Sequence, residues 1–501
     1  MSQAALPRPQ RSTGPVSAER LARLLAAELH GTDASITGIT AASGRVVPGD
    51  LFVAIPGANA HGVAFFPAAR AAGAVAVLTD SAGARQIDGD LPVLVADDPR
   101  AVTGPAAAHI YGDPSARLRV IGVTGTSGKT TTTFLIRAGL IAAGRSSGLI
   151  GTVGTFLDED EVSTGFTTPE AAELQSLLAV IAERGMSDVV MEVSSHGLSL
   201  GRVNGTRFTA GGFTNLSMDH LDFHPTMEAY FAAKAALFDR WARRARIVID
   251  DDWGRRLAAR AVADDLQTVS VTDPTAGWHA ESIAVGADGA TVFRAVGPGG
   301  AVPAGCRIPG AFNVANALLA LSLLDAVGVP PDVAAAAIAT AQVPGRMERV
   351  DCGQPFLAIV DYAHKPAAVA AAVQTLRPLT PGRLITVLGC GGDRDRMKRP
   401  VMGAVAAQGS DLLIVTDDNP RTEDPATIRA AMLAGAAEAA PSAEVRDIGD
   451  RAEAIAAAVR TARAGDTVLV AGKGHEPGQE IAGVLHPFDD RVELRRALGS
   501  C

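Results

Sequence analysis

The chain has 501 residues, of which 47% are hydrophobic and 20% are charged, and this length is enough for about three domains of ordinary size. Its formal net charge of −9 at pH 7 argues against a nucleic-acid partner, because nucleic acids select basic surfaces. No uninterrupted apolar stretch approaches the ~18 residues of a membrane helix, so we expect no membrane span.

The ends and the cysteines indicate the compartment. Residues 1–17 contain proline and arginine but no apolar centre of the kind found in signal peptides, and we expect a disordered tail there. The four cysteines, Cys306, Cys352, Cys390 and Cys501, show no CxxC spacing. This pattern is typical of free thiols in a reducing compartment. The sequence therefore predicts a cytoplasmic, soluble, multidomain protein.

A small α/β unit is expected over residues 18–114. Short apolar runs predict strands at 51–55, 74–78 and 92–96, and an alanine-rich segment predicts a helix at 66–73. The unit has no catalytic cluster of its own, so taken alone it indicates only a small binding domain.

The segment at 118–134 predicts a phosphate-binding loop. An apolar strand at 120–123 is followed by a glycine-rich turn at 125–128 and by a helix that begins near Lys129. Free backbone N–H groups and the helix dipole at such a turn attract anions. Lys129 would reach the outer phosphates and the Thr130 hydroxyl a Mg²⁺ ion. Val123 stands where the strict motif has its first glycine, and the alternative is a plain strand-to-helix turn that contains Gly-Lys.

A second cluster follows the apolar strand expected at 188–192. It carries Glu192, two serines and His196 at the end of the strand. Ligands in open α/β sheets lie beyond the carboxyl ends of the strands, so Glu192 is a candidate Mg²⁺ ligand beside the phosphate loop. The alternative is a carboxylate that caps a turn.

The segments at 215–224 and 226–241 contain two further candidates. His220 lies among acids and a second histidine, which suggests a metal site or, more commonly, a polar loop. If residues 226–241 form a helix, Lys234 falls on the same arc as its large apolar side chains. Such a lysine either extends past its neighbours to water or is desolvated with a lowered pKa. A neutral lysine can take up CO₂ and become a carbamate, which is a carboxylate-like metal ligand.

Two asparagines, Asn313 and Asn316, lie one turn apart in an otherwise apolar helix expected to about residue 327. They either face a ligand or satisfy the backbone. After a linker at 342–346, apolar strands at 356–360, 384–388, 412–415 and 467–470 each end in a polar loop. Alanine-rich helices separate them, which predicts a mainly parallel sheet with a composite site at one edge.

In their order along the chain these motifs resemble those of the Mur ligases, and the resemblance spans residues 38–490. The ATP loop of that family is similar to TGTSGKT at 124–130, which accounts for the displaced glycine. The other matches are TTP at 167–169, EVSSHG at 192–197, residues 215–224, Tyr230-x-x-x-Lys234, Asn313-x-x-Asn316, GRME at 345–348, DYAH at 361–364, GGDRD at 391–395, DNPR at 418–421 and GKGHE at 472–476.

The resemblance implies an α/β fold of three domains. These would be an N-terminal UDP-binding domain at 18–114 after the tail at 1–17, a central P-loop ATPase with a parallel sheet at 115–344, and a C-terminal Rossmann-like domain at 345–501 that binds the amino acid. It also implies ATP as co-substrate and two Mg²⁺ ions.

The resemblance further implies a role for each matching residue. ATP would contact Gly125, Thr126, Ser127, Gly128, Lys129, Thr130, Thr131, Asn313, Arg346 and Asp361. The metal ligands would be Thr130, Glu192, His220 and Lys234, the last as N6-carboxylysine. The UDP-muramoyl peptide would contact Ser43, Asn59, Thr167, Thr168, Ser194 and Arg202.

The C-terminal motifs look like those of the members that add meso-diaminopimelate, through Arg394, Asp418, Asn419, Pro420, Arg421, Gly472 and Glu476. Lysine-adding members lack the arginine of DNPR. The distal end of diaminopimelate carries an amine and a carboxylate, so Arg394 and Arg421 can bind the carboxylate and Glu476 the ammonium. Without that carboxylate two arginines would remain unpaired, which rejects lysine.

Three positions depart from the family pattern and all concern nucleotide-sugar binding. Ala42-Ser43-Gly44 stands where many members have Asp-Ser-Arg, Phe166 where they have asparagine, and Leu200 where they have glutamine. The implied reaction is ATP-dependent addition of meso-diaminopimelate to the D-Glu side chain of UDP-N-acetylmuramoyl-L-Ala-D-Glu, through an acyl phosphate, by a monomer. The alternatives are a lysine-adding Mur ligase, a folylpolyglutamate-synthetase-like amide ligase, or a nucleotide-dependent binding module without turnover.

Overall fold

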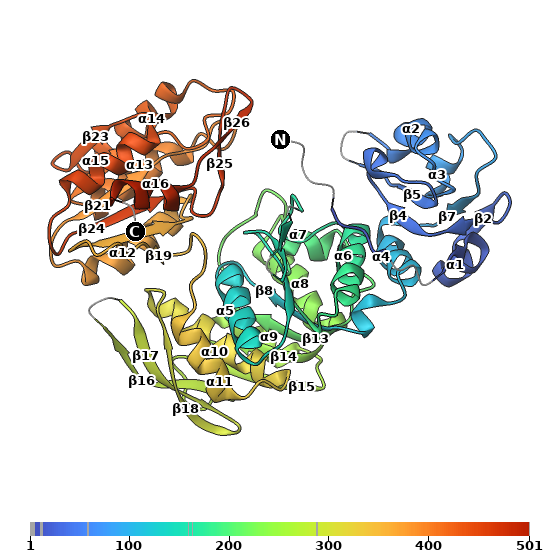
Figure 1. The fold of residues 1–501 in the computed structure, drawn as a ribbon, viewed down its shortest axis with the longest axis horizontal. Helices are drawn as coiled ribbons and strands as arrows, with labels where there is room; N and C mark the ends of the chain where they lie inside the picture. The colour runs from blue at the N-terminus through green and yellow to red at the C-terminus, as the bar shows by residue number, and fades with distance from the viewer. Residues whose placement is uncertain are drawn as a thin grey trace. The chain divides into compact units, whose positions relative to one another are not determined.

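The computed structural model describes residues 6–10, 14–57, 60–158, 160–162, 164–286 and 289–499 (Figure 1). The chain is divided into two compact units. The first comprises Met1–Glu281, Ala295–Val302 and Ala315–Ile338, and the second comprises Ser282–Arg294, Pro303–Val314 and Ala339–Cys501. The first two domains expected from the sequence therefore fall largely into one unit.

The N-terminal part is a five-stranded sheet in the order β2-β7-β6-β5-β4, parallel except for β2. Buried aliphatic side chains of β5 and β6 pack with residues of α1 and α4 in one hydrophobic core. The predicted strands at 51–55, 74–78 and 92–96 are confirmed to within two residues at each end. The elements are β1 (Val16–Ser17), α1 (Ala18–Leu25), β2 (Glu28–His30), β3 (Ser35–Ile36), β4 (Gly38–Thr40), η1 (Ser43–Arg45), β5 (Asp50–Ala54), η2 (Gly62–Phe65), α2 (Phe66–Ala71), β6 (Ala76–Thr79), α3 (Ser81–Ala84), β7 (Val93–Val95), α4 (Pro99–Ile110) and η3 (Pro114–Ala116).

The described residues before α1 differ from the expected disordered tail. Arg8 donates a hydrogen bond of 2.8 Å to the buried carboxylate of Asp50, and the backbone N–H of Gln10 donates to Glu183 at 2.8 Å. Strand β1 pairs with β3. Arg8, Gln10 and strand β1 therefore have specific partners in the folded chain.

The central part is built on a sheet in the order β11-β10-β9-β12-β8-β13-β14-β15-β16-β17-β18. Strand β8 lies between β12 and β13, parallel to both, so the loops after these three strands meet at one edge. The helix predicted at 226–241 ends in a π-helical turn, and β14 begins directly after it. The elements are β8 (Arg119–Thr124), α5 (Lys129–Ala142), β9 (Ser147–Ile150), β10 (Thr155–Leu157), β11 (Asp160–Val162), α6 (Ala171–Glu183), β12 (Asp188–Glu192), α7 (Ser195–Ser199), β13 (Phe208–Phe213), α8 (Met227–Ala236), η4 (Leu237–Trp241), β14 (Ala242–Val248), α9 (Asp252–Arg260), β15 (Asp265–Ser270), β16 (Trp278–Val285), β17 (Thr291–Gly297), β18 (Gly300–Cys306), α10 (Ala311–Ala326) and α11 (Pro331–Thr340).

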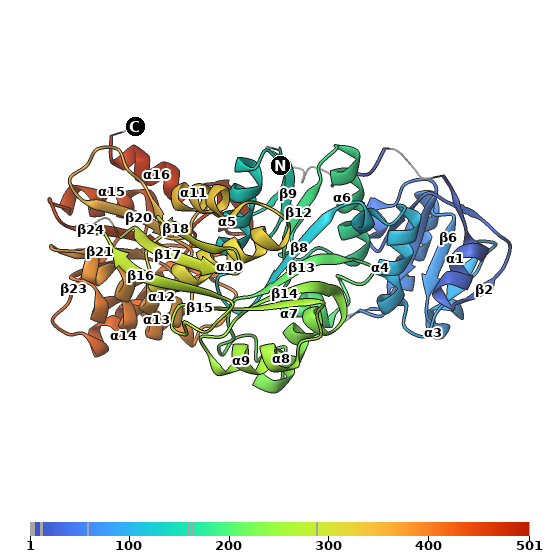
Figure 2. The same ribbon diagram turned by 90° about the horizontal axis from the view of Figure 1, so that it is seen from below.

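The C-terminal part is a sheet in the order β19-β20-β24-β21-β22-β23, parallel except for β19. Helices α15 and α16 cover one face and α12, α13 and α14 cover the other (Figure 2). The predicted mainly parallel sheet is confirmed, and the polar loops after β20, β21, β22 and β24 lie at its carboxyl edge. The elements are β19 (Glu348–Arg349), β20 (Leu357–Asp361), α12 (Pro366–Leu376), η5 (Arg377–Leu379), β21 (Leu384–Leu388), α13 (Lys398–Gly409), β22 (Leu412–Val415), α14 (Pro425–Ala439), β23 (Glu444–Asp447), α15 (Arg451–Thr461), β24 (Thr467–Ala471), β25 (Gly478–Ile481), β26 (Val484–Pro487) and α16 (Asp490–Ala497).

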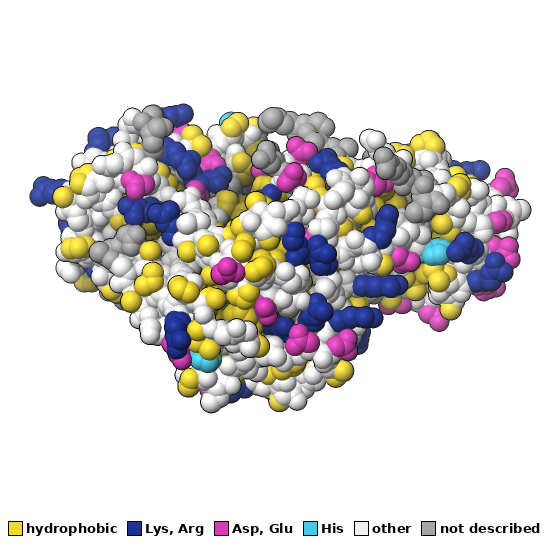
Figure 3. Space-filling view, turned by 60° about the horizontal axis from the view of Figure 1, so that its bottom comes forward, with side chains coloured by type: hydrophobic (Ala, Val, Ile, Leu, Met, Phe, Trp, Pro, Cys, Tyr) yellow, Lys and Arg dark blue, Asp and Glu magenta, His cyan; other side chains and the backbone are white. Residues whose placement is uncertain are grey.

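The surface carries charges of both signs, and the cysteines differ in state. Basic and acidic side chains are interspersed on the face shown in Figure 3, and within the described ranges we find no helix both long and apolar enough to cross a bilayer. Cys306 and Cys390 are buried free thiols, and burial raises their pKa values to about 11 and about 12. Cys352 is disulfide-bonded, so the expectation of four free thiols is wrong for this residue. Cys501 lies outside the described residues.

Candidate active site

The predicted phosphate loop joins β8 to α5 as a strand, a glycine turn and a helix. Gly125 and Gly128 have φ angles of +147° and +88°, a backbone region that favours glycine. At Gly128 space is also limited, because a Cβ there would lie 2.4 Å from Oδ1 of Asn316. Asn215 holds the turn: its carbonyl accepts from Thr126 N at 2.9 Å and its Oδ1 from Ser127 N at 3.0 Å.

Two lysines converge on the carbonyl oxygen of Gly125. Lys129 Nζ donates to it at 2.9 Å and Lys234 Nζ at 2.7 Å. Lys234 is only 1% exposed, so the alternative that it extends to water is wrong. Burial lowers the pKa of Lys234 well below its ordinary value, and the neighbouring positive charge of Lys129 lowers it further. A neutral amine at this position is the form that can add CO₂.

Glu192, at the end of β12, lies directly against the start of α5. Its Oε1 accepts hydrogen bonds of 2.9 Å from the Thr130 hydroxyl and from Thr152 N, and its Oε2 accepts one of 3.0 Å from the Thr152 hydroxyl. Glu192 is 1% exposed. The structure therefore brings together the two predicted Mg²⁺ ligands Thr130 and Glu192, and Thr131 is buried in the next position of the helix.

His220 lies within a group of aromatic side chains. Its ring centroid is 4.9 Å from that of His196 and 6.2 Å from that of Tyr230, and its φ angle of +53° turns the chain sharply. Burial lowers the pKa values of His196 and His224. His224 is 4% exposed, and its Nε2 has no hydrogen-bond partner among the described residues. This buried nitrogen is a candidate hydrogen-bond partner for a bound ligand.

The side chains around the phosphate loop fit a Mg²⁺ ion, on the condition that Lys234 is modified. Oxygen ligands are those that Mg²⁺ prefers, and Thr130 and Glu192 supply a hydroxyl and a carboxylate. An unmodified ammonium at Lys234 would repel the ion, whereas a carbamate would add a second carboxylate-like group. No cluster of three or more His, Cys, Asp or Glu side chains suited to a metal occurs in the described ranges, and the predicted set contains only Glu192 and His220 of these types.

The predicted peptide-binding residues adjoin Glu192. The Thr168 hydroxyl donates to Ser194 Oγ at 3.1 Å, and Thr167 is hydrogen-bonded to the Thr152 side chain at 3.0 Å. Arg202 donates to Thr168 O at 3.0 Å and pairs with Glu170 at 2.8 Å. The buried Nε of Arg202 has no hydrogen-bond partner in the described structure.

A cavity of about 330 Å³ lies next to Arg202 and contains two of the three positions that depart from the family pattern. Phe166 and Leu200 both line it, and the Arg202 guanidinium stacks 4.4 Å from the centroid of Phe166. Ser43 lies in η1 beside the lining residues, whereas Asn59 lies outside the described residues. The full lining is Ala41, Ala42, Arg45, Ile55, Arg100, Thr103, Phe166, Glu170, Ala171, Ala172, Glu173 and Leu200.

In the second unit, two of the residues predicted to contact adenosine are linked through the chain segment before β19. Asp361 accepts from Met347 N at 2.7 Å, and the neighbouring Arg346 stacks on Tyr362 at 4.4 Å. Burial raises the pKa of Asp361, although the charge of Arg346 opposes this. Asn313 is buried and donates to Pro309 O at 2.8 Å, so its amide satisfies the backbone.

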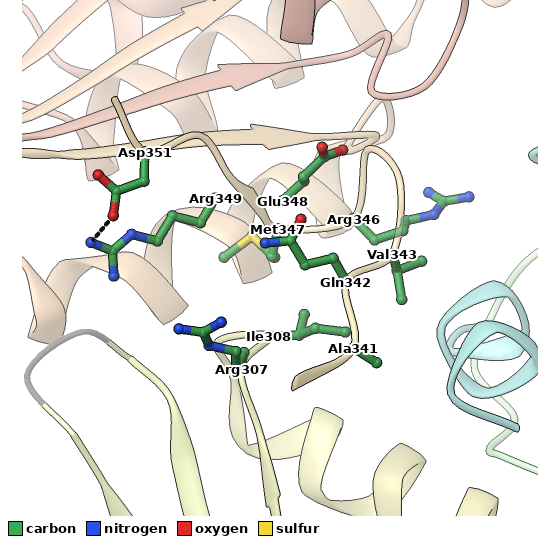
Figure 4. Close-up of a pocket in the computed structure, with 10 residues that line it drawn as sticks. All are labelled: Arg307, Ile308, Ala341, Gln342, Val343, Arg346, Met347, Glu348, Arg349 and Asp351. Atoms are coloured by element: carbon green, nitrogen blue, oxygen red, sulfur yellow. Dashed lines mark hydrogen bonds and ion pairs between the residues drawn. The ribbon is translucent and has the colours of Figure 1, made fainter. Parts of the chain in front are cut away.

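This segment also lines a second cavity, of about 160 Å³ (Figure 4). The Arg346 guanidinium extends away from those of Arg307 and Arg349 in this view, and Arg349 is paired with Asp351 at 3.0 Å.

The C-terminal motifs meet at the carboxyl edge of the sheet. The Asn419 amide donates to Oε2 of Glu476 at 2.9 Å, which joins the loops after β22 and β24. Gly472 has φ +116°, and a Cβ there would lie 2.7 Å from Oδ2 of the buried Asp418. A Cβ at Gly392 would lie 2.0 Å from the Pro420 carbonyl oxygen. Three of the predicted motifs are thus packed closely together.

The two predicted arginines differ in how they are held. Arg421, with φ +55°, donates to Gly392 O at 2.6 Å and pairs with Glu480 at 3.2 Å. Arg394 is exposed and makes no hydrogen bond or ion pair with any described residue. Arg421 is therefore held by protein partners, whereas the exposed Arg394 is available to a ligand.

Comparisons with known proteins agree with this arrangement. Residues 35–113, 123–324 and 345–474 match, in turn, the Mur ligase family catalytic domain, the Mur ligase middle domain and the Mur ligase glutamate ligase domain. The chain belongs to the Mur ligase family.

Named relatives cover nearly the whole chain. A UDP-N-acetylmuramoyl-L-alanyl-D-glutamate–2,6-diaminopimelate ligase of Streptomyces avermitilis is 52% identical, with 98% of each chain covered. A protein of the same name from Corynebacterium efficiens is 54% identical over 89% of this chain and 87% of its own length. A solved structure of a protein with this name is 34% identical, with a TM-score of 0.68, and covers 93% of this chain and 95% of its own.

Three residues of this Mur ligase were missed as site residues by the sequence reasoning. Thr152 holds Glu192, Glu480 pairs with Arg421, and Lys473 contacts Glu476 and Asn419. Lys473 lies inside the GKGHE motif, and a lysine between two glycines at a strand end was the available signal. Thr152 and Glu480 carry no comparable pattern.

Proposed function

We propose that this Mur ligase uses ATP to join meso-diaminopimelate to the D-Glu side chain of UDP-N-acetylmuramoyl-L-Ala-D-Glu. The observation that carries the proposal is the carboxyl edge of the C-terminal sheet, which we call the acceptor edge. There Arg421 and Arg394 stand on loops packed against the Asn419–Glu476 pair. A site with both cationic and anionic side chains fits the amine and carboxylate of the distal end of diaminopimelate. The names of relatives 52% and 54% identical give the same substrate.

The first chemical step is phosphoryl transfer to a carboxylate. An oxygen of the D-Glu side chain attacks the γ-phosphorus of ATP, the bond to the β,γ-bridging oxygen breaks, and ADP leaves. The loop at 125–130 binds the phosphates through backbone N–H groups, and Lys129 neutralises their charge. Lys129 donates to the carbonyls of Gly125 and Thr126, so its ammonium lies at the loop that would bind the phosphates.

The second step forms the amide. The amine nitrogen of diaminopimelate attacks the carbonyl carbon of the acyl phosphate, the carbon–oxygen bond to phosphate breaks, and the nitrogen releases a proton. Glu476 and the two arginines bind the distal end, so that the other amine is presented to the acyl phosphate.

Thr130, Glu192, His220 and carbamylated Lys234 would hold Mg²⁺, which when bound neutralises charge on the phosphates. Thr152 keeps Glu192 in place through two hydrogen bonds. The residues predicted for the muramoyl peptide, with Arg202 fixed by Thr168 and Glu170, would bind the carboxylate donor. Domain boundaries at 18–114, 115–344 and 345–501 belong to the same proposal.

The test is phosphate release from ATP in the presence of UDP-N-acetylmuramoyl-L-Ala-D-Glu and one amino acid at a time. We expect release that depends on meso-diaminopimelate and is far slower with lysine or glutamate. Lysine-dependent release would favour a lysine-adding ligase, glutamate-dependent release a folylpolyglutamate-synthetase-like enzyme, and release independent of any amino acid would contradict the ligase function.

A further inference from the structure

Lys473 is a completely buried cation at the acceptor edge of the second unit. Its side chain is 0% exposed, and its ammonium contacts Oδ1 of Asn419 at 3.0 Å and Oε2 of Glu476 at 3.2 Å. A buried charge is costly unless it is paired and hydrogen-bonded. Both of its partners belong to the predicted amino-acid site, so the interactions that offset the desolvation of this charge lie within that site.

The contacts form a closed triangle. Asn419 Nδ2 donates to Oε2 of Glu476 at 2.9 Å, and Lys473 donates to both. Asn419 Oδ1 also accepts from Glu480 N at 3.0 Å, and the Glu480 side chain pairs with Arg421. The Lys473 ammonium thus links the loops after β22 and β24, and Asn419 extends the network to the β25–β26 hairpin.

The triangle divides the carboxylate of Glu476 into two roles. Both donors, from Asn419 and Lys473, go to Oε2, and Tyr362 is a third side chain that hydrogen-bonds to this carboxylate. The Glu476 side chain is 33% exposed although its partner Lys473 is fully buried. A carboxylate anchored by one oxygen from the protein side can offer the other to an ammonium without losing its orientation.

We propose that Lys473 is a positioning residue for the amino-acid substrate, acting through Glu476 and Asn419. This inference rests on the proposed function, because it assigns Glu476 to the ammonium group of the incoming amino acid. It predicts that loss of Lys473 weakens the use of meso-diaminopimelate specifically, and leaves the use of ATP and of the muramoyl peptide nearly unchanged.

The experiment is a double-mutant cycle of Lys473→Met and Glu476→Gln, read as kcat/KM for meso-diaminopimelate. We expect each single variant to lose about 10- to 100-fold, the worth of a charge-assisted hydrogen bond. The double variant should lose no more than the worse single variant, because both changes remove the same interaction. Losses that multiply would overturn the proposal, as would an unchanged KM for meso-diaminopimelate in Lys473→Met.

Three further measurements distinguish a positioning role of Lys473 from a purely structural one. Lys473→Gln keeps a hydrogen-bond donor without the charge, so it should lose less than Lys473→Met, and it replaces the methionine variant in the cycle if that variant does not fold. KM values for ATP and the muramoyl peptide should stay within about twofold, whereas a rise equal to that for diaminopimelate would overturn the proposal. Lys365→Met, a half-buried lysine before α12, is the matched control.

The wild-type protein is assayed first. If its phosphate release does not depend on meso-diaminopimelate, the proposed function fails. If that dependence is present and the cycle shows multiplying losses, only the role of Lys473 fails.

Discussion

The phosphate loop and the acceptor edge hold their charges in different ways. Around the phosphate loop, Glu192 and Lys234 are each 1% exposed. Lys234 donates to Gly125 O of the loop, and Glu192 accepts from Thr130 and Thr152. At the acceptor edge, the side chains of Arg421, Glu476 and Glu480 are 23%, 33% and 41% exposed. Glu192 and Lys234 are thus desolvated, whereas Arg421, Glu476 and Glu480 are partly open to water.

This difference follows from what each site must bind. A phosphate group is the same in every turnover, and fixed charges in a low-dielectric site act on it most strongly. An amino acid must enter, be distinguished from near relatives and be ordered beside the acyl phosphate. Partly exposed charges are screened by water, so selectivity at the acceptor edge depends on the geometry of its side chains. We assign the orientation of these side chains to buried groups such as Lys473.

The largest effect is expected for Lys234→Ala at the phosphate end. The change removes the amine whose pKa is lowered by burial and by Lys129, and with it the proposed carbamate. A loss of several kcal/mol of charge stabilisation corresponds to about 10²- to 10³-fold in kcat. The measurement is phosphate release with and without added formate or acetate, either of which should restore part of the activity.

The control for this variant is Arg240→Ala, which removes an exposed cation from the adjoining turn η4 and should keep full activity. Lys234→Ala with full activity in the absence of formate would show that the carbamate has no role. An inactive variant that neither small acid restores would contradict the carbamate in particular, because a lost carboxylate-like group should be replaceable.

A smaller and more selective effect is expected for Arg421→Met at the acceptor edge. The change removes the donor to Gly392 O and the partner of Glu480. Discrimination between meso-diaminopimelate and lysine, measured as the ratio of their kcat/KM values, should fall by about 10²-fold, since a charged bidentate partner is lost. Arg446→Met, which breaks a pair with Glu444 on β23, should leave the ratio unchanged.

An unchanged ratio in Arg421→Met would place carboxylate recognition on another residue, with the exposed Arg394 the next to test. A fall caused only by a higher rate with lysine would instead show that Arg421 acts by excluding lysine.

The positions of both sites could largely be predicted from the sequence, because the ends of apolar strands can be recognised in it. Glycine turns after apolar runs identified the loops at 125–130 and 472–476, and parallel strands bring such loops to one edge whatever the details of packing. Lys234 was found from helical periodicity, and its burial decided between the two interpretations that periodicity left open.

What the sequence could not predict depends on contacts between distant segments. Thr152 reaches Glu192 across 40 positions and Lys473 reaches Asn419 across 54, and no local pattern reports either. The π-helical turn at η4 and the ion pair of Arg8 have the same origin, since tertiary packing overrides local preference. The disulfide at Cys352 was missed because spacing in sequence does not determine which thiols meet.

The smallest expected effect is a pH dependence of stability. It arises from the ion pair of Glu423 and Arg399, which supports the acceptor edge. Glu423 accepts hydrogen bonds from Arg399 at 2.8 and 3.1 Å and from Asp393 N at 2.6 Å. Hydrogen bonding to Arg399 lowers the pKa of Glu423 from 4.5 to about 2. Arg399 is 3% exposed and its guanidinium also lies 3.4 Å from Gly391 O, so this pair supports the loop that carries Arg394.

Because the folded-state pKa of Glu423 is depressed, the unfolded chain takes up its proton first as the pH falls. The stabilisation by this group is therefore fully present above pH 4.5 and is lost as the pH falls to about 2. Glu423→Gln should lower the midpoint of thermal unfolding at pH 7, and its difference from wild type should shrink between pH 4.5 and pH 2. Comparing the two proteins at each pH cancels the other carboxylates that titrate in this window. A difference that stays constant down to pH 2 would show that the glutamine variant is destabilised by altered packing and not by loss of charge, and the acceptor edge would then depend on shape where we assign it to an ion pair.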